Sequence, residues 1–456
     1  MNFKKLASLC LLGAAATIAT ACSSGNKDAG TGTNDLTGEV TIKVAHNMDF
    51  VSIPDGIAAA ADRLNEKYKE EGRDLKIVIE KDYQRIDWDE YMQNVLFATK
   101  NGEGPDIFSL AGNLQDHVNN GLVLDVTGLD ESKFVDGALD SFKMDGKLYA
   151  MPFDVPTRAI YFNKDALRKH GWSEEKIAEF PQKFADGSFT WEDFIALNKE
   201  LQDAGVVKWG LLHRPGKGSD FLDVLREYGS AHYNEKGQLV VDKESITRFF
   251  QFMYDAANTD KITPQDLTQQ QWTSIQKMVG DGTAFSYYGP VFASTYVAQE
   301  VNQTPEELVN HIGFAVFPKS KYNKKPFTVA APQAVAVNAS TKYPEIAKEL
   351  LDELHKGDSV NQLAKHGGTI FALASVKDAN ELPEITENPI LKDVGYMAEH
   401  VITVPPIGDE SVFRNELFKQ ITLLELGQIT PEKAYEDFKV QIELNAADTS
   451  NIVFND

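Results

Sequence analysis

The chain of 456 residues contains only two cysteines, Cys10 and Cys22. Cys10 lies in an uncharged, largely apolar run from Leu6 to Ala21, which follows the short basic start Met1 to Lys5. This layout is typical of a secretory signal, and the run is too short to span a bilayer as a mature helix. Once the signal is removed, Cys22 has no partner, so disulfides cannot stabilise the exported protein.

Long apolar runs and positive charge are scarce in the rest of the chain. No later stretch is apolar for long enough to cross a membrane. Lys and Arg total 45 against 68 Asp and Glu, which gives a formal net charge of -23. Because a protein that binds a nucleic-acid backbone needs a basic stripe, we expect no nucleic-acid partner. An acidic surface keeps a protein soluble, and we expect a monomer.

The sequence also lacks the signatures of common enzymes. It contains no Gly-x-x-x-x-Gly-Lys-Ser/Thr, no His-Glu-x-x-His and no Gly-x-Ser-x-Gly. The run from Gly102 to Gly104 lacks the third glycine of a dinucleotide-binding loop, and the His-Gly-Gly run from His366 to Gly368 is better explained as a turn. Asp87, Asp89 and Glu90 crowd the start of an expected helix, where the helix dipole favours carboxylates. We therefore expect no catalytic residue, no metal and no cofactor.

Hydrophobic patterning predicts an α/β region after residue 38. Strands are expected at residues 40–44, 75–79 and 104–108, and amphipathic helices lie between them. The order strand, helix, strand, helix, strand indicates parallel pairing in an open sheet whose faces are covered by helices.

A second α/β region is expected after Asn163. Thr190, Thr304 and Thr430 each precede a helix-start pattern, either a capping box or a proline at the first helical position. About 415 residues follow the N-terminal segment, more than a single core usually reaches, so we expect two lobes.

The stretch from Gly146 to Leu167 reads as strand on both sides of two prolines, Pro152 and Pro156. Proline cannot donate to a sheet ladder and is confined to the edges and ends of strands. One continuous central strand is therefore not expected here.

The end of the signal has a more specific pattern. Ala19-Thr20-Ala21-Cys22 is followed by serine and glycine, and resembles the lipobox of bacterial lipoproteins, although Ala19 replaces the usual leucine. This resemblance implies a signal peptide at residues 1–21 and a lipidated (palmitoylated) Cys22 that anchors the protein to the cell membrane, facing outside the cytoplasm. Residues 22–38 would form a flexible tether. The alternative is an ordinary cleaved signal with an incidental cysteine.

Six segments spread along the chain resemble those of a known family in their order and approximate spacing. The segments are 104–108 (GPDIF), 145–152 (DGKLYAMP), 161–165 (YFNKD), 187–194 (GSFTWEDF), 278–290 (MVGDGTAFSYYGP) and 424–435 (LELGQITPEKAY). The family that they resemble is that of the lipid-anchored, sugar-binding solute-binding proteins of bacterial ABC importers, the maltose-binding-protein-like class.

The resemblance implies an α/β, two-lobed periplasmic-binding-protein-like fold of type II, in which open sheets are joined by hinge crossings. The two prolines would fall at the first crossing, where extended chain has no ladder partners, and residues 328–335 would form the second. The family layout gives an N-lobe of residues 36–152 and 333–391 and a C-lobe of residues 153–332 and 392–456.

The resemblance also implies a function. The protein would capture a carbohydrate, specifically an oligosaccharide, between hinged lobes and deliver it to the permease subunits of an ABC transporter. Two alternatives stay open. One is a secreted carbohydrate-active enzyme, because a spatial pair of glycosidase carboxylates is invisible in a sequence. The other is a receptor for a non-sugar polyol, such as an inositol or a polyol phosphate.

Ligand-binding residues are expected where the carboxyl ends of strands meet the cleft. We expect Asp154 to be the main polar contact, and one of Tyr287 and Tyr288 to stack on the sugar, because strand neighbours point to opposite faces. Leu110 stands nearest the family's usual aromatic position, a departure from the family pattern that weakens the case for stacking from that loop. The full expected set is His46, Asn47, Asp49, Asn113, Phe153, Asp154, Arg158, Arg214, Tyr287, Tyr288, Gln333, Phe371 and Phe413.

Overall fold

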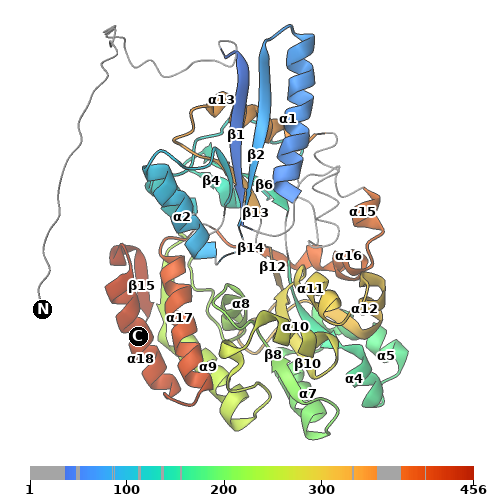
Figure 1. Cartoon of the computed structure of the whole chain (residues 1–456). Helices are drawn as coiled ribbons and strands as arrows, with labels where there is room; N and C mark the ends of the chain where they lie inside the picture. Colours follow the sequence, from blue (N-terminus) through green and yellow to red (C-terminus); the bar gives the residue numbers. More distant parts are fainter. Residues whose placement is uncertain are drawn as a thin grey trace, which may run out of the picture. The chain divides into compact units, whose positions relative to one another are not determined.

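The computed structural model describes residues 36–47, 52–84, 86, 88–110, 114–134, 138–154, 157–330, 333–356, 382–405 and 407–455 (Figure 1). The chain divides into two units, residues 1–36 and residues 37–456, and the described helices and strands belong to the second. The predicted signal, nearly all of the tether, and Cys22, Asp49, Asn113 and Phe371 lie outside the described residues. Of Phe153, Asp154 and Gln333, only the backbone is described.

The first sheet has five strands in the order β2-β1-β3-β13-β6. β1 (Gly38–His46) runs parallel to β2 (Leu75–Tyr83) and to β3 (Ile107–Leu110). β13 (Gln333–Val337) and β6 (Met151–Asp154) complete the sheet in antiparallel pairing. The parallel pairing predicted for the first three strands is confirmed.

Helices connect and cover these strands. α1 (Ser52–Glu70) joins β1 to β2 and packs against β2 and α13 (Pro344–Glu353). α2 (Trp88–Lys100) joins β2 to β3. Ile57 and Leu64 of α1 are buried, at the helical spacing that the sequence predicts for an inward face.

The second sheet has four strands in the order β11-β7-β10-β8. β10 (Ala284–Pro290) is parallel to β8 (Trp209–Leu212) and antiparallel to β7 (Arg158–Asn163). β11 (Ile312–Ala315) pairs with the other side of β7, also antiparallel. β7 and β11 are buried along their whole length, as strands covered on both faces should be.

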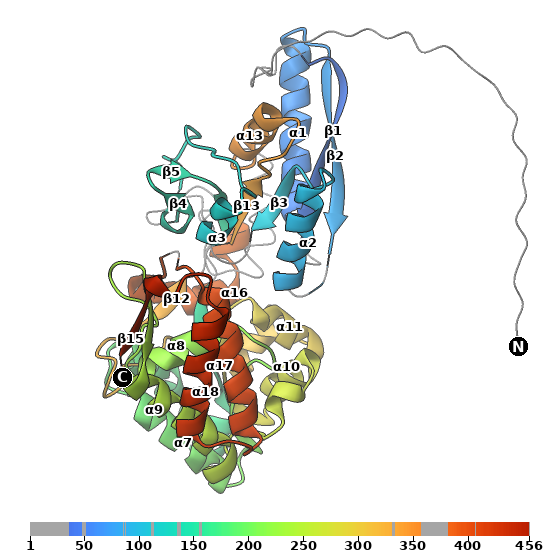
Figure 2. The same ribbon diagram turned by 90° about the vertical axis from the view of Figure 1, so that its left-hand side faces the viewer.

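Several helices surround the second sheet. α17 (Glu410–Glu425) and α18 (Pro431–Asn445) lie side by side, and both contact α9 (Lys243–Tyr254) (Figure 2). α8 (Asp220–Glu227) contacts β10, as does α10 (Trp272–Gly280), which precedes that strand.

The predicted helix starts are confirmed. Thr190 opens α7 (Trp191–Asp203) and Thr304 opens α12 (Pro305–His311), each through a complete capping box. Thr430 caps α18. The remaining α-helices and strands of the described residues are α3 (Leu114–Asn119), β4 (Lys143–Met144), β5 (Lys147–Leu148), α4 (Lys164–Lys169), α5 (Glu174–Ala178), α6 (Phe180–Ala185), β9 (Leu239–Asp242), α11 (Ala293–Glu300), β12 (Thr328–Ala330), α15 (Pro383–Thr386), α16 (Pro389–Val394), β14 (Val401–Thr403) and β15 (Ile452–Asn455).

The proline-containing stretch joins the two sheets. β6 ends at Asp154 as an edge strand of the first sheet, and β7 begins at Arg158 inside the second. Pro152 therefore lies in an edge strand, where a missing ladder donor costs little. The lobe boundaries drawn from the sequence stay predictions. Among the described residues, no helix combines the length and apolar character that a membrane span needs.

Candidate functional site

One edge of the second sheet collects the carboxyl ends of its parallel strands. β8 ends there at Leu212 and β10 at Pro290, which is paired with Arg158, the first residue of the antiparallel strand β7. Ligands of open α/β sheets bind outside this kind of edge. Arg214 and the first residues of α8 follow β8 directly, so they belong to the same edge.

Asp220, at the start of α8, is the centre of a buried ionic cluster at this edge. Its Oδ1 lies 2.7 Å from Arg158 Nε, and its Oδ2 accepts a hydrogen bond of 2.9 Å from Arg214 Nη1. Arg158 also donates to Asp223 Oδ2 at 3.2 Å and to Ser219 Oγ at 2.8 Å. Arg158, Asp220 and Asp223 are all buried. A buried charge must be paired in this way to offset its desolvation, so the four charges hold one another in place.

The pKa values in the cluster reflect burial and pairing. Burial acts to lower the pKa of Arg158, but Asp223 and Asp220 outweigh it and hold that pKa above its usual value. Burial raises the pKa of Asp223 to about 7, although Arg158 opposes the shift.

The two predicted tyrosines sit on β10 beside this cluster. Tyr287 packs edge-on against Tyr161, with 5.3 Å between the ring centroids, and Tyr288 lies on the other face near Phe221. The exposed fraction is 2% for Tyr287 and 1% for Tyr288, and neither hydroxyl has a hydrogen-bond partner among the described groups. Burial raises the pKa of both phenols. Which of them faces a ligand stays a prediction.

Tyr287 reaches along its strand toward the edge. A Cβ placed on Gly289 would lie 2.3 Å from the Tyr287 hydroxyl oxygen, so only glycine at that position leaves room for the ring. Burial is the main cause of the raised pKa of the Tyr287 phenol; the charge of Asp220 adds to it and that of Arg214 opposes it.

Trp272 is a residue of this edge that the sequence reasoning missed. It begins α10, and 39% of its surface is exposed, so part of the ring is open to solvent. The Arg214 guanidinium carbon lies 5.4 Å from the centre of the Trp272 ring. The sequence gives only a signal of position. α10 leads into β10, and the carboxyl end of β10 lies at this edge, so α10 must begin near the same edge.

Residues predicted from the first sheet have structural partners. Asn47 donates from Nδ2 to the Ile86 carbonyl at 3.0 Å and accepts from the Ile86 amide at 3.1 Å. Its own amide donates to Ser109 Oγ at 3.2 Å. His46 is fully buried at the end of β1. Two large apolar side chains, Tyr83 and Ile86, are exposed at the carboxyl end of β2.

The remaining predicted residues differ in their surroundings. Phe413 is fully buried on α17, 4.9 Å from the Phe438 ring, and packs inside the pair α17 and α18. Asp154 and Gln333 are paired in register where β6 meets β13. Among the described residues, no group of three or more His, Cys, Asp and Glu side chains is placed to hold a metal ion.

Solved structures of similar shape establish the fold. The chain is similar to the maltose-bound MalE3 of T. maritima, with a TM-score of 0.69 at 17% identity, covering 89% of this chain and 99% of that one. It is also similar to a cyclo/maltodextrin-binding protein complexed with maltotetraose, with a TM-score of 0.65 at 18% identity, covering 89% and 96%. The predicted two-lobed, type II periplasmic-binding-protein-like fold is thereby confirmed.

Curated relatives match at the level of sequence. An arabinooligosaccharide-binding protein of Bacillus subtilis (strain 168) is 21% identical over 222 residues, which is 49% of this chain and 48% of that protein. The maltodextrin-binding protein MdxE of the same organism is 25% identical over 294 residues, 62% of each chain. The matches thus span about half to three fifths of these relatives.

The family profile described as bacterial extracellular solute-binding protein matches residues 52–354. This span runs from the first residue of α1 to just past α13. It includes every strand of the two large sheets apart from β1, which precedes it. It also includes the Asp220 cluster and Trp272. The chain belongs to the bacterial extracellular solute-binding protein family.

Proposed function

We propose that this protein captures an oligosaccharide between its two lobes and delivers it to the permease of an ABC importer. Membership of an extracellular solute-binding family supports this role, as do relatives named for binding arabinooligosaccharides and maltodextrins. The family and these relatives are binding proteins, so we infer no catalytic step.

The observation that carries the proposal is the pairing of Trp272 with Arg214 at the edge of the second sheet. A sugar offers flat apolar faces and many hydroxyls, so its sites combine an aromatic platform with charge-assisted hydrogen bonds. Trp272 supplies a half-exposed ring, and Arg214 supplies donors, with its Nη1 held by Asp220. A ring and a guanidinium that are fixed before binding lose little freedom when the ligand arrives.

We assign the site residues different roles. Trp272 stacks on a sugar ring and Arg214 binds its hydroxyls, while Arg158 acts through Asp220 as a positioning residue. Asp154 and Gln333 contact the ligand from the crossing between the lobes. The other contacts come from the expected residues of the first lobe, His46, Asn47, Asp49 and Asn113.

We also propose that Cys22 carries the lipid that holds the protein at the outer face of the cell membrane, where it works as a monomer. The lipobox-like pattern and the extracellular family support this placement. Binding draws the two lobes together, because a ligand that contacts both lobes binds the closed state better than the open one.

A thermal-shift screen of the mature protein against neutral oligosaccharides tests the proposal. A ligand at about 100 times its dissociation constant should stabilise the fold by about 2.7 kcal/mol. Chromatography of the same mixtures separates a receptor from an enzyme, since a receptor returns the sugar unchanged. The appearance of shorter sugars would favour the carbohydrate-active enzyme instead.

A further inference from the structure

The loop between β8 and α8 carries two glycines, Gly216 and Gly218, whose surroundings differ. A Cβ built on Gly216 would meet no heavy atom within 4 Å. A Cβ built on Gly218 would lie 1.8 Å from Arg214 Nη1, 2.0 Å from its Cζ and 2.4 Å from its Nε. Non-bonded heavy atoms are comfortable only at about 3.5 to 4.0 Å. The guanidinium of Arg214 therefore occupies the space that a side chain at position 218 would need.

Backbone conformation does not explain either glycine. Neither residue has a φ in the left-handed region, so the backbone does not exclude alanine at either position. Space distinguishes the two, because position 216 is open whereas position 218 is buried and faces the guanidinium. Gly218 is thus needed for the place that Arg214 takes, and not for the path of the loop.

The backbone that follows Gly218 is held by the buried ionic cluster. Ser219 Oγ accepts a hydrogen bond of 2.8 Å from Arg158 Nη2, and the Ser219 carbonyl accepts from the Leu222 amide at 2.9 Å as α8 begins. The Arg214 side chain is long, has several rotatable bonds and is partly exposed. A methyl group added at position 218 should therefore displace the Arg214 side chain and leave the start of α8 in place.

Displacement of the guanidinium would undo two contacts of Arg214. Its Nη1 donates to Asp220 Oδ2 at 2.9 Å, and its guanidinium carbon lies 5.4 Å from the centre of the Trp272 ring. Asp220 would keep its pairing with Arg158, so we expect the protein to stay folded. What is lost is the fixed position of Arg214 between Asp220 and the Trp272 ring.

We propose that Gly218 is a positioning residue, whose missing side chain lets Arg214 lie between Asp220 and Trp272 at the edge where we place the oligosaccharide. The effect of Gly218 on affinity rests on the function proposed above, in which Arg214 binds sugar hydroxyls. Its effect on the place of Arg214 does not, and it is measurable in the ligand-free protein.

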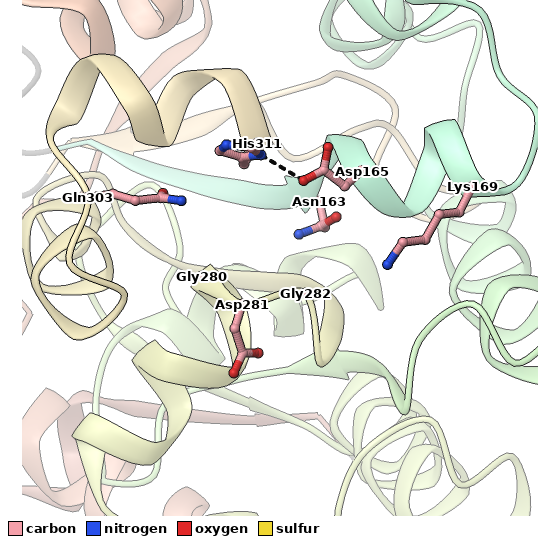
Figure 3. Close-up of a pocket in the computed structure, with 8 residues that line it drawn as sticks. All are labelled: Asn163, Asp165, Lys169, Gly280, Asp281, Gly282, Gln303 and His311. Atoms are coloured by element: carbon pink, nitrogen blue, oxygen red, sulfur yellow. Dashed lines mark hydrogen bonds and ion pairs between the residues drawn. The ribbon is translucent and has the colours of Figure 1, made fainter.

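A pocket at the other end of β7 supplies a remote control (Figure 3). β7 begins at Arg158 and ends at Asn163, which lines this pocket, so the two places are about 17 Å apart along the strand. Lys169 also lines the pocket and is exposed. Lys169→Ala therefore changes the protein far from the loop that carries Gly218.

Fluorine-19 magnetic resonance of the mature protein, with 5-fluorotryptophan at its five tryptophans, reports on the Trp272 ring without any ligand. Trp272→Phe identifies the Trp272 signal by its disappearance. Gly218→Ala should move this signal toward its position in Arg214→Ala, because the guanidinium leaves the ring in both variants. Gly216→Ala, the matched control in the same loop, and Lys169→Ala should leave the signal at its wild-type position.

A double-variant cycle tests whether the effect of Gly218 runs through Arg214. In an Arg214→Ala protein, the addition of Gly218→Ala should move the Trp272 signal no further, because no guanidinium is left to displace. With a maltodextrin or arabino-oligosaccharide, Gly218→Ala should weaken binding by about tenfold or more, as for the loss of a hydrogen bond to a charged group. In the Arg214→Ala background the same change should alter affinity by no more than about twofold. Melting curves confirm that each variant is folded.

The proposal is overturned if Gly218→Ala leaves the Trp272 signal at its wild-type position, if Gly216→Ala moves the signal as far, or if the shift persists in the Arg214→Ala background. It is also overturned if Arg214→Ala weakens sugar binding and Gly218→Ala does not. If Arg214→Ala binds sugar like the wild type, or if the wild type binds none, the function proposed for the edge fails. The Trp272 signal still decides in that case whether Gly218 positions Arg214.

Discussion

Arg158 Nε lies 2.7 Å from Asp220 Oδ1, and the two side chains join the first residue of β7 to the first residue of α8 at the edge of the second sheet. Both are buried, so each charge depends on the other. The same carboxylate holds Arg214, which faces Trp272. One aspartate thus supports both the local fold and the placement of the arginine that we propose to bind the ligand.

Asp220→Asn should destabilise the protein strongly. Removing one partner of a buried pair leaves an uncompensated charge and typically costs about 3 to 5 kcal/mol. Urea unfolding measures the loss. Asp203→Asn is the control, because Asp203 pairs with Lys199 on the surface of α7 and should change the unfolding free energy by less than about 1 kcal/mol. Equal effects of the two changes would show that the Asp220 cluster does not support the fold.

Trp272→Ala should weaken oligosaccharide binding by about tenfold or more while the melting temperature stays near that of the wild type. The ring is partly exposed, so its removal leaves little unfilled space in the core, whereas lost stacking lowers affinity. Calorimetric titration gives the affinity. Phe97→Ala, which removes a ring that is 60% exposed on α2, should bind like the wild type. An unchanged affinity for Trp272→Ala would remove Trp272 from the site.

Tyr287→Phe isolates a buried hydroxyl that has no partner among the described groups. Removing it should leave the unfolding free energy unchanged or raise it by up to about 1 kcal/mol, because an unsatisfied buried polar group is lost. If the hydroxyl receives a hydrogen bond from the sugar in the closed protein, affinity should fall in the same variant. A clear loss of stability would mean that the hydroxyl has a partner in solution.

The open α/β architecture was predictable because it follows from local patterns. The strand and helix periods before residue 110 dictate parallel pairing, and Thr190 and Thr304 mark helix starts that the structure reproduces. Each of these signals lies within a few neighbouring residues, so no tertiary contact is needed to read it.

The candidate site was less predictable because it depends on contacts between distant residues. Arg158 and Asp220 belong to different elements, and the sequence around either residue gives no sign that the two form an ion pair. Trp272 looks like an ordinary helix residue until its place at the sheet edge is known. The hydrogen bonds between the Asn47 side chain and the backbone of Ile86 likewise join residues that are far apart in the sequence.

His355 should make stability depend on pH. Its Nε2 lies 2.9 Å from the Pro152 carbonyl oxygen in β6, and burial lowers its pKa to about 4. The folded pKa is below the unfolded value of about 6.5, so the unfolded state binds more protons between these pH values. The contribution of His355 to the free energy of unfolding is therefore complete above pH 6.5, and it is lost as the pH falls toward 4.

The comparison of wild type with His355→Gln at several pH values isolates this effect from other titrating groups. From pH 6.5 to pH 4 the free energy of unfolding of the wild type should fall by as much as about 3 kcal/mol more than that of His355→Gln. A difference that stays constant over this range would mean that His355 is not held neutral in the fold.

Cys22→Ser should release the protein from membranes or leave it unprocessed, since the acyl chains attached to this residue would supply about 0.8 kcal/mol per buried methylene. Fractionation of cells and immunoblotting measure the distribution. Cys10→Ser is the matched control, because Cys10 lies in the segment expected to be discarded. Quantitative recovery of Cys22→Ser in the membrane fraction would place the anchor elsewhere.

The most direct test is calorimetric titration of the mature protein with a panel of neutral oligosaccharides, beginning with maltodextrins and arabino-oligosaccharides, followed by chromatography of the recovered sugar. We predict saturable binding of at least one sugar with one high-affinity site, a weaker affinity in Trp272→Ala, and recovery of the sugar unchanged. If no neutral oligosaccharide binds the folded protein, or if the recovered sugar has been cleaved, the proposed role of a carbohydrate-capturing receptor is contradicted.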